Sequence, residues 1–130
     1  MKYEITRLKN GLRVAAAPLK ERKSVAAGLW VHVGARDEEP RLNGISHFLE
    51  HLVFKGTRRR SSRQIKEDVE GKGGLLNAFT SEEFTCFFAK VPKPHFELAL
   101  DVLADMVTGA RLTARDVEKN SHCEYQQHRA

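Results

Sequence analysis

Residues 43–56, Asn-Gly-Ile-Ser-His-Phe-Leu-Glu-His-Leu-Val-Phe-Lys-Gly, are the stretch around which this chain of 130 residues is organised. Their apolar side chains recur at helical spacing, which predicts a short helix with one buried face. The residues of that face are Ile45, Phe48, Leu49 and Leu52. Asn43 is the expected N-cap, and Gly56 follows the last apolar residues, where helices often end.

His47, Glu50 and His51 carry the chemistry of this helix. Two histidines four residues apart lie one turn from each other on the same face, so both imidazoles can reach a single metal ion. Glu50 lies on nearly the same side, within reach of a water bound to that metal. His-x-x-Glu-His is a zinc-hydrolase pattern in the inverted order. The alternative is a solvated helix face, but the surrounding apolar residues predict burial, and buried imidazoles beside a buried carboxylate are costly without a cation.

The composition predicts one globular domain with a hydrophobic core, because 41% of the residues are apolar and 30% are charged. The net charge of +5 includes a local basic cluster. Its members are Lys55, Arg58, Arg59, Arg60, Arg63 and Lys66. The cluster lacks interleaved aromatic residues and leads into a helix. We therefore expect a solvated loop and no nucleic-acid partner.

Neither end nor middle of the chain carries a membrane signal. No apolar run approaches the roughly 18 residues that span a bilayer, and the N-terminus lacks the apolar core of a signal peptide. We expect a cytoplasmic protein without a membrane partner, with Cys86 and Cys123 reduced. Cys86 is interpreted as a small core residue.

The N-terminal third predicts strands. Asn10-Gly11 between residues 3–8 and 12–17 is a strong hairpin signal. Residues 25–33 predict a strand covered on both faces. Within it His32 shares a face with Trp30, and we interpret it as a structural or substrate-side residue.

The later elements alternate between helix and strand. Ser61 to Gln64 resembles a capping box that opens a helix ending at Gly71. Strands are expected at 75–80 and 84–91. An apolar stripe then predicts a helix ending at Gly109, formed by Phe96, Ala99, Leu100, Leu103, Met106 and Val107. Thr113 and Asp116 cap a last helix. The fold class is α+β, a mostly antiparallel sheet with helices packed on one face.

Several stretches together resemble the pitrilysin/insulinase-type zinc peptidases, which include mitochondrial processing peptidases and their bacterial relatives. The similar segments are residues 10–14, 33–38, 44–57 and 73–81, with Thr85 beyond them. The resemblance covers roughly residues 3 to 119 and is carried by specific motifs. It implies the fold of a peptidase domain of this type.

The resemblance also implies a zinc-dependent metalloendopeptidase with Zn2+ as cofactor. His47 and His51 would ligate zinc as neutral imidazoles, and Glu50 would take a proton from the metal-bound water as general base. A peptide or protein substrate in extended form would pair with an edge strand by β-augmentation. The residues of that strand are Leu76, Asn77, Ala78, Phe79 and Thr80, with Asn77 and Ala78 facing the scissile bond.

The third zinc ligand of this family is a glutamate on a later helix, and its position falls here on Gln127. A second family glutamate falls on Asn120. One explanation is that Glu124 or His128 substitutes, since positions 124, 127 and 128 share a helical face. The other, which we favour, is that the sequence from about Asn120 departs from the family. Residues 1–130 would then form a single truncated N-terminal peptidase domain.

Two functions remain open from the sequence. The intact His-x-x-Glu-His favours a metallopeptidase that works with a second homologous domain or subunit. Gln127 favours the alternative, a non-catalytic relative or truncated fragment that acts as a peptide- or partner-binding module.

Overall fold

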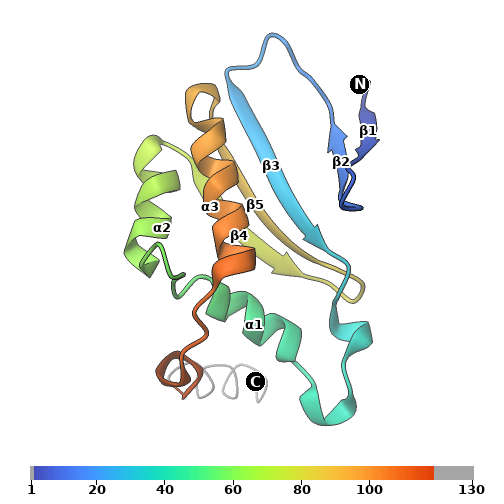
Figure 1. Ribbon diagram of the computed structural model, residues 1–130, viewed down its shortest axis with the longest axis vertical. Helices are drawn as coiled ribbons and strands as arrows, with labels where there is room; N and C mark the ends of the chain where they lie inside the picture. Colours follow the sequence, from blue (N-terminus) through green and yellow to red (C-terminus); the bar gives the residue numbers. More distant parts are fainter. Residues whose placement is uncertain (1, 119–130) are drawn as a thin grey trace.

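The computed structural model describes residues 2–118 and contains two antiparallel sheets and three complete helices in that range (Figure 1). The strands are β1 (Glu4–Arg7), β2 (Arg13–Ala16), β3 (Ser24–Val31), β4 (Leu75–Thr80) and β5 (Thr85–Pro92). The helices are α1 (Ile45–Val53), α2 (Ser62–Val69) and α3 (Phe96–Gly109). Short 3-10 turns connect them at Ala35–Asp37, Pro40–Leu42, Glu70–Lys72 and Lys93–His95.

The main sheet has the strand order β3-β5-β4, with β5 antiparallel to both neighbours. Helices α2 and α3 lie against one face of it, and α1 lies at the end where β3 and β4 terminate (Figure 1). The expected α+β architecture, a mostly antiparallel sheet with helices on one face, is therefore confirmed. Among the described helices none is long and apolar enough to cross a membrane.

The hairpin of β1 and β2 forms a separate two-stranded sheet. Its tip is the predicted Asn10-Gly11, where Gly11 has φ +92° and the Asn10 side chain accepts from the Leu12 amide (3.0 Å). Glycine adopts this left-handed conformation without steric cost, so the turn signal in the sequence was correct.

The hydrophobic core lies between the main sheet and helices α2 and α3. Its buried residues are Ile65, Val69, Leu76, Phe87, Ala89, Val91, Ala99, Val102, Leu103 and Met106. The α3 stripe differs from the prediction at its N-terminal end, because Phe96 and Leu100 are exposed whereas Val102 is fully buried. Cys86 is buried as expected, and burial raises the pKa of its thiol, which makes it an inert core residue.

The prediction that residues 25–33 are covered on both faces is wrong for the described part of the chain. Side chains of β3 alternate between half-buried and exposed, and Trp30 is 63% exposed. The reason is that α2 and α3 cover one face of the sheet only. On the other face Trp30 contacts Phe79 and Phe84, with ring centroids 5.8 and 5.0 Å apart.

The predicted helix starts and stops are largely correct. The Ser61 hydroxyl accepts from the Gln64 amide (3.2 Å) and the Gln64 side chain accepts from the Ser61 amide (2.9 Å), which completes the capping box of α2. Thr113 accepts from the Asp116 amide (3.2 Å) and donates to its carboxylate (2.7 Å), as expected for the start of the last helix. Residues 114–118 are helical.

Candidate metal centre

Helix α1 carries the candidate site, and its N-terminus is held by a residue from the preceding loop. Gly44, with φ +89°, is the N-cap, so the expectation of Asn43 is wrong by one position. The carboxylate of Glu38 accepts from the amides of Gly44 (2.8 Å) and Ser46 (2.9 Å). A carboxylate there satisfies free N–H groups and interacts favourably with the helix dipole. The local sequence favoured Asn43 because the group that caps these amides, the Glu38 carboxylate, lies six residues before Gly44 and is not part of the local capping pattern.

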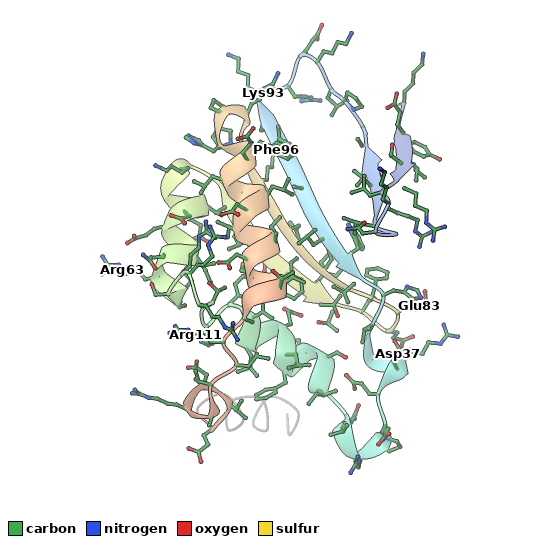
Figure 2. All side chains as sticks on the ribbon, in the orientation of Figure 1. Asp37, Arg63, Glu83, Lys93, Phe96 and Arg111 are labelled. Carbon is green, nitrogen blue, oxygen red and sulfur yellow. The ribbon has the colours of Figure 1, made fainter. Side chains whose placement is uncertain are left out.

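The loop that presents Glu38 is itself docked on the turn between β4 and β5. The amide of Ala35 donates to the Ser81 carbonyl (3.1 Å), and that of Arg36 to the Glu82 carbonyl (2.8 Å). A Cβ on Gly34 would lie 2.3 Å from the Ser81 carbonyl oxygen, so this close approach requires glycine. Figure 2 shows Asp37 of this loop next to Glu83 of the turn.

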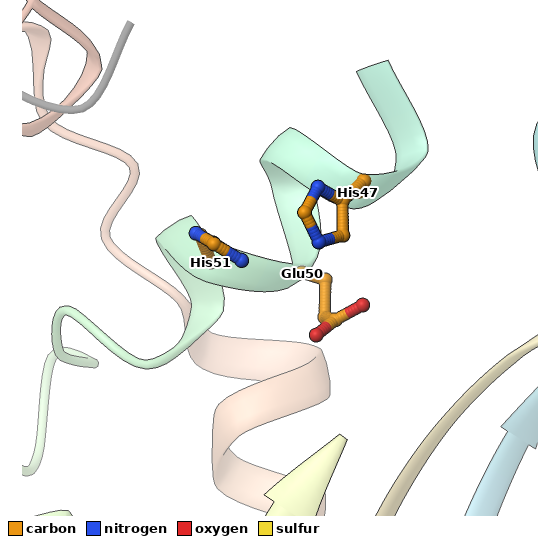
Figure 3. A group of neighbouring side chains, drawn as sticks. All are labelled: His47, Glu50 and His51. Atoms are coloured by element: carbon orange, nitrogen blue, oxygen red, sulfur yellow. The ribbon is translucent and has the colours of Figure 1, made fainter. Parts of the chain in front are cut away.

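The structure brings His47, Glu50 and His51 together as the spacing predicts. One potential ligand atom from each residue lies within 4.8 Å of the others. The two imidazole centroids are 4.5 Å apart with an angle of 61° between the rings. Figure 3 shows both rings on one side of α1 with the Glu50 carboxylate beside them.

Glu50 is the most buried member of this cluster, with 8% of its surface exposed. The Thr80 hydroxyl, at the end of β4, donates a hydrogen bond to Glu50 Oε2. Within residues 2–118 the Thr80 hydroxyl is the one hydrogen-bond donor to this buried carboxylate, and a cation at the imidazoles would add a compensating interaction. Two imidazole nitrogens with an adjacent carboxylate are suitable donors for Zn2+, so these residues fit that metal.

The third-ligand candidates Gln127, Glu124 and His128, together with Asn120, lie outside the described residues. A catalytic zinc site has three protein ligands and one open position. His47 and His51 would provide two of them, and the Glu50 carboxylate lies within 4.8 Å of their ligand atoms.

The strand predicted to bind substrate, β4, runs along one edge of the described main sheet. Leu76 is buried in the core, Ala78 and Thr80 are half-buried on the helix side, and Asn77 and Phe79 are exposed. The amide of Ala78 donates to Oδ1 of Asn77 (2.8 Å). Because Thr80 also contacts Glu50, the end of this strand meets the candidate metal centre.

The loop after α1 is anchored by a buried ion network that the sequence did not reveal. Arg60, with 10% of its side chain exposed, contacts the carboxylates of Asp68 (2.9 Å), Asp101 (2.6 Å) and Asp105 (3.0 Å). The Thr57 hydroxyl donates to the same Asp105 oxygen (2.7 Å). Burial alone would lower the pKa of Arg60, but the hydrogen bonds to Asp101, Asp68 and Asp105 outweigh it and raise that pKa.

The interpretation of the basic cluster as solvated holds for five of its six members, which are exposed, and is wrong for Arg60. The Arg60 side chain is 10% exposed, whereas Arg59 and Arg63 are exposed and pair with Asp101 (3.1 Å) and Glu67 (2.8 Å). Much of the local positive charge is therefore neutralised within the fold.

Comparisons with known proteins agree with the resemblance noted in the sequence. The family model described as insulinase (peptidase family M16) matches residues 13–130. A protein named as an uncharacterized zinc protease of Streptomyces coelicolor is 47% identical over 87% of this chain and 25% of its own length. A probable mitochondrial-processing peptidase subunit beta of Arabidopsis thaliana is 43% identical over 88% of this chain and 22% of its own.

A solved structure shares the fold. The crystal structure of a protease from Helicobacter pylori superimposes with a TM-score of 0.83 at 32% sequence identity, covering 88% of this chain and 28% of that one. The chain thus spans about a quarter of the length of the curated relatives that it matches.

Proposed function

The chain belongs to the insulinase family, peptidase family M16, and from this membership we propose that it serves zinc-dependent hydrolysis of peptide bonds, with Glu50 as general base. The observation that carries the proposal is the cluster of His47, Glu50 and His51 on one side of α1, with ligand atoms within 4.8 Å of one another. Family relatives are named zinc proteases, which supports zinc as the metal.

His47 and His51 would hold the metal through one ring nitrogen each. Zinc bound there would polarise the scissile carbonyl and lower the pKa of a coordinated water. The chain's own contribution is orientation, because α1 is fixed at its N-terminus by Glu38 and at its C-terminal side by the Arg60 network. The third ligand would be one of Glu124, Gln127 and His128, which lie outside the described residues.

Glu50 takes the proton from the attacking water and afterwards delivers it to the leaving amine. A general base must lie within hydrogen-bond reach of the proton that it accepts, and the Glu50 carboxylate adjoins both imidazoles. Its burial limits contact with bulk water, which strengthens the electrostatic interactions between the carboxylate and the reacting groups.

The substrate is an extended peptide that pairs with the free edge of β4. Asn77 Oδ1 now accepts from the Ala78 amide, and a peptide carbonyl would take its place. Pairing through backbone groups is largely independent of sequence, which suits an endopeptidase acting on extended segments.

A second homologous domain or subunit is the proposed partner. The support is that the chain spans about a quarter of its relatives' length and that one relative is named as a subunit beta. Such a partner would cover the site and exclude water from it.

The competing function is a peptide- or partner-binding module without catalysis. The specific observation behind it is Gln127 in place of the family's acidic ligand, because an amide oxygen binds zinc weakly. Under this alternative the β4 edge still binds peptides, but the metal is not retained.

The test combines Glu50→Gln with Glu67→Gln, a matched change at an exposed residue of α2. Zinc per chain is measured by mass spectrometry after dialysis against a weak chelator, and hydrolysis is followed with a fluorogenic peptide. We expect one zinc in all three proteins and a rate reduced by a factor on the order of 100 or more for Glu50→Gln only. A hydrolysis rate of Glu50→Gln equal to that of the wild-type protein would refute the general-base role. Wild-type protein without zinc would favour the binding module.

A further inference from the structure

We propose that the Thr80 hydroxyl is a positioning residue for Glu50, so that the strand that binds substrate also orients the general base; this inference rests on the proposed function. Thr80 Oγ1 donates to Glu50 Oε2, joining the end of β4 to α1 across 30 residues of sequence. Within the described residues no second hydrogen bond reaches this carboxylate. Thr80 therefore determines how the carboxylate is turned.

The effect of this hydrogen bond follows from the freedom of a glutamate side chain. Glutamate has three rotatable torsions, and its terminal torsion is broad. Fixing Oε2 on the Thr80 hydroxyl selects one arrangement and leaves Oε1 for a water at the imidazoles. Displacement of a reacting group by about 1 Å can cost about 100-fold in rate, so this selection matters for the base.

The donor is itself rigid. Threonine is stiff at χ1, and Thr80 pairs with Thr85 of β5 in the sheet. The Thr85 hydroxyl donates to the Val33 carbonyl (2.8 Å), and the next residue, Ser81, receives the docked loop at Gly34. The backbone that carries the Thr80 hydroxyl is thus held by β5 and by the loop that leads to α1.

The consequence concerns substrate and base together. The same six-residue strand, β4, would pair with the peptide and, through Thr80, positions the carboxylate of Glu50. Their relative position then depends on this strand as well as on the packing of α1 against the sheet. Loss of the hydroxyl should reduce the rate of the bound complex more than it weakens peptide binding.

The kinetic test compares Thr80→Val, which keeps the shape and removes the hydroxyl, with Thr80→Ser, which keeps the hydroxyl. Thr108→Val is the matched control, because Thr108 is exposed on α3 and its hydroxyl donates to the Ala104 carbonyl (2.6 Å). We expect Thr80→Val to retain one zinc, to lower kcat by about ten- to hundredfold and to leave KM within about twofold. Thr80→Ser should recover most of kcat.

A second readout needs no metal and no activity. Urea unfolding of the metal-free protein is compared for Thr80→Val, Glu50→Ala and the double variant. If the hydroxyl acts through Glu50, Thr80→Val lowers the midpoint in the native background and leaves it unchanged in the Glu50→Ala background.

The outcomes separate this inference from the proposed function. Three results would overturn the positioning role while Glu50→Gln remains inactive. One is a kcat of Thr80→Val equal to that of the wild type, and another is an equal loss of kcat in Thr80→Val and Thr80→Ser. The third is a change in urea midpoint for Thr80→Val that is the same in the native and the Glu50→Ala backgrounds. Full activity of Glu50→Gln would instead overturn the proposed function, and the positioning role with it.

Discussion

Replacement of Arg60 by methionine tests whether the buried ion network holds the loop after α1. Methionine fills the space of the arginine stem without its charge. The change leaves three carboxylates without their common partner, and they differ in exposure. Asp105 is 6% exposed, whereas Asp68 and Asp101 are 35% and 45% exposed. Water can solvate the last two, so the cost falls mainly on Asp105.

The expected magnitude follows from that burial. Removing one partner of a buried ion pair costs about 3–5 kcal/mol because the other charge stays buried. The Thr57 hydroxyl continues to donate to Asp105 and moderates the loss. We therefore expect Arg60→Met to lower the free energy of unfolding by about 3 kcal/mol at pH 7.

The assay is urea unfolding, with Arg63→Met as the matched control. Arg63 points outward from α2 (Figure 2) and pairs with Glu67 at an exposed i,i+4 position, so its loss should cost about 0.3–0.5 kcal/mol. A loss below about 1 kcal/mol for Arg60→Met, or one equal to that of Arg63→Met, would refute the argument.

Two further predictions concern the carboxylates of Glu38 and Asp101. Glu38→Gln keeps one acceptor but removes the charge at the α1 N-terminus. We therefore expect urea unfolding to show a free energy of unfolding lower by about 1 kcal/mol. A loss equal to that of Glu39→Gln, a change at an exposed residue, would contradict this cap. Hydrogen bonds from Arg60 and Arg59 hold the pKa of Asp101 below its usual range. Stability from this group is present above the unfolded pKa and is lost as pH falls through the lower, folded pKa. Asp101→Asn should therefore flatten the decline of Tm below about pH 4, and an unchanged slope would contradict the assignment.

Local patterns predicted most of the fold. The strand at residues 75–80, the Ser61 cap and the end of α3 at Gly109 follow from short-range preferences that the tertiary structure does not override. The cluster of His47, Glu50 and His51 was predictable for the same reason, since helical spacing alone brings their side chains together.

What the sequence could not supply depends on distant residues. Arg60 was predicted to be a solvated surface residue because its partners Asp101 and Asp105 lie 41 and 45 residues away in the sequence. The Glu50–Thr80 hydrogen bond likewise joins two elements whose docking no local pattern encodes. The exposed outer face of β3 was missed because an apolar run does not tell how many helices cover it.

The position of Trp30 allows its intrinsic fluorescence to report on peptide binding at β4. It is the single tryptophan of the chain, so intrinsic fluorescence excited selectively in the indole comes from one site. That indole is 63% exposed and lies edge-on to the Phe79 ring of β4. A peptide that pairs with β4 would alter the polarity around this ring pair, and the shift in emission wavelength would give a binding isotherm without any label on either molecule.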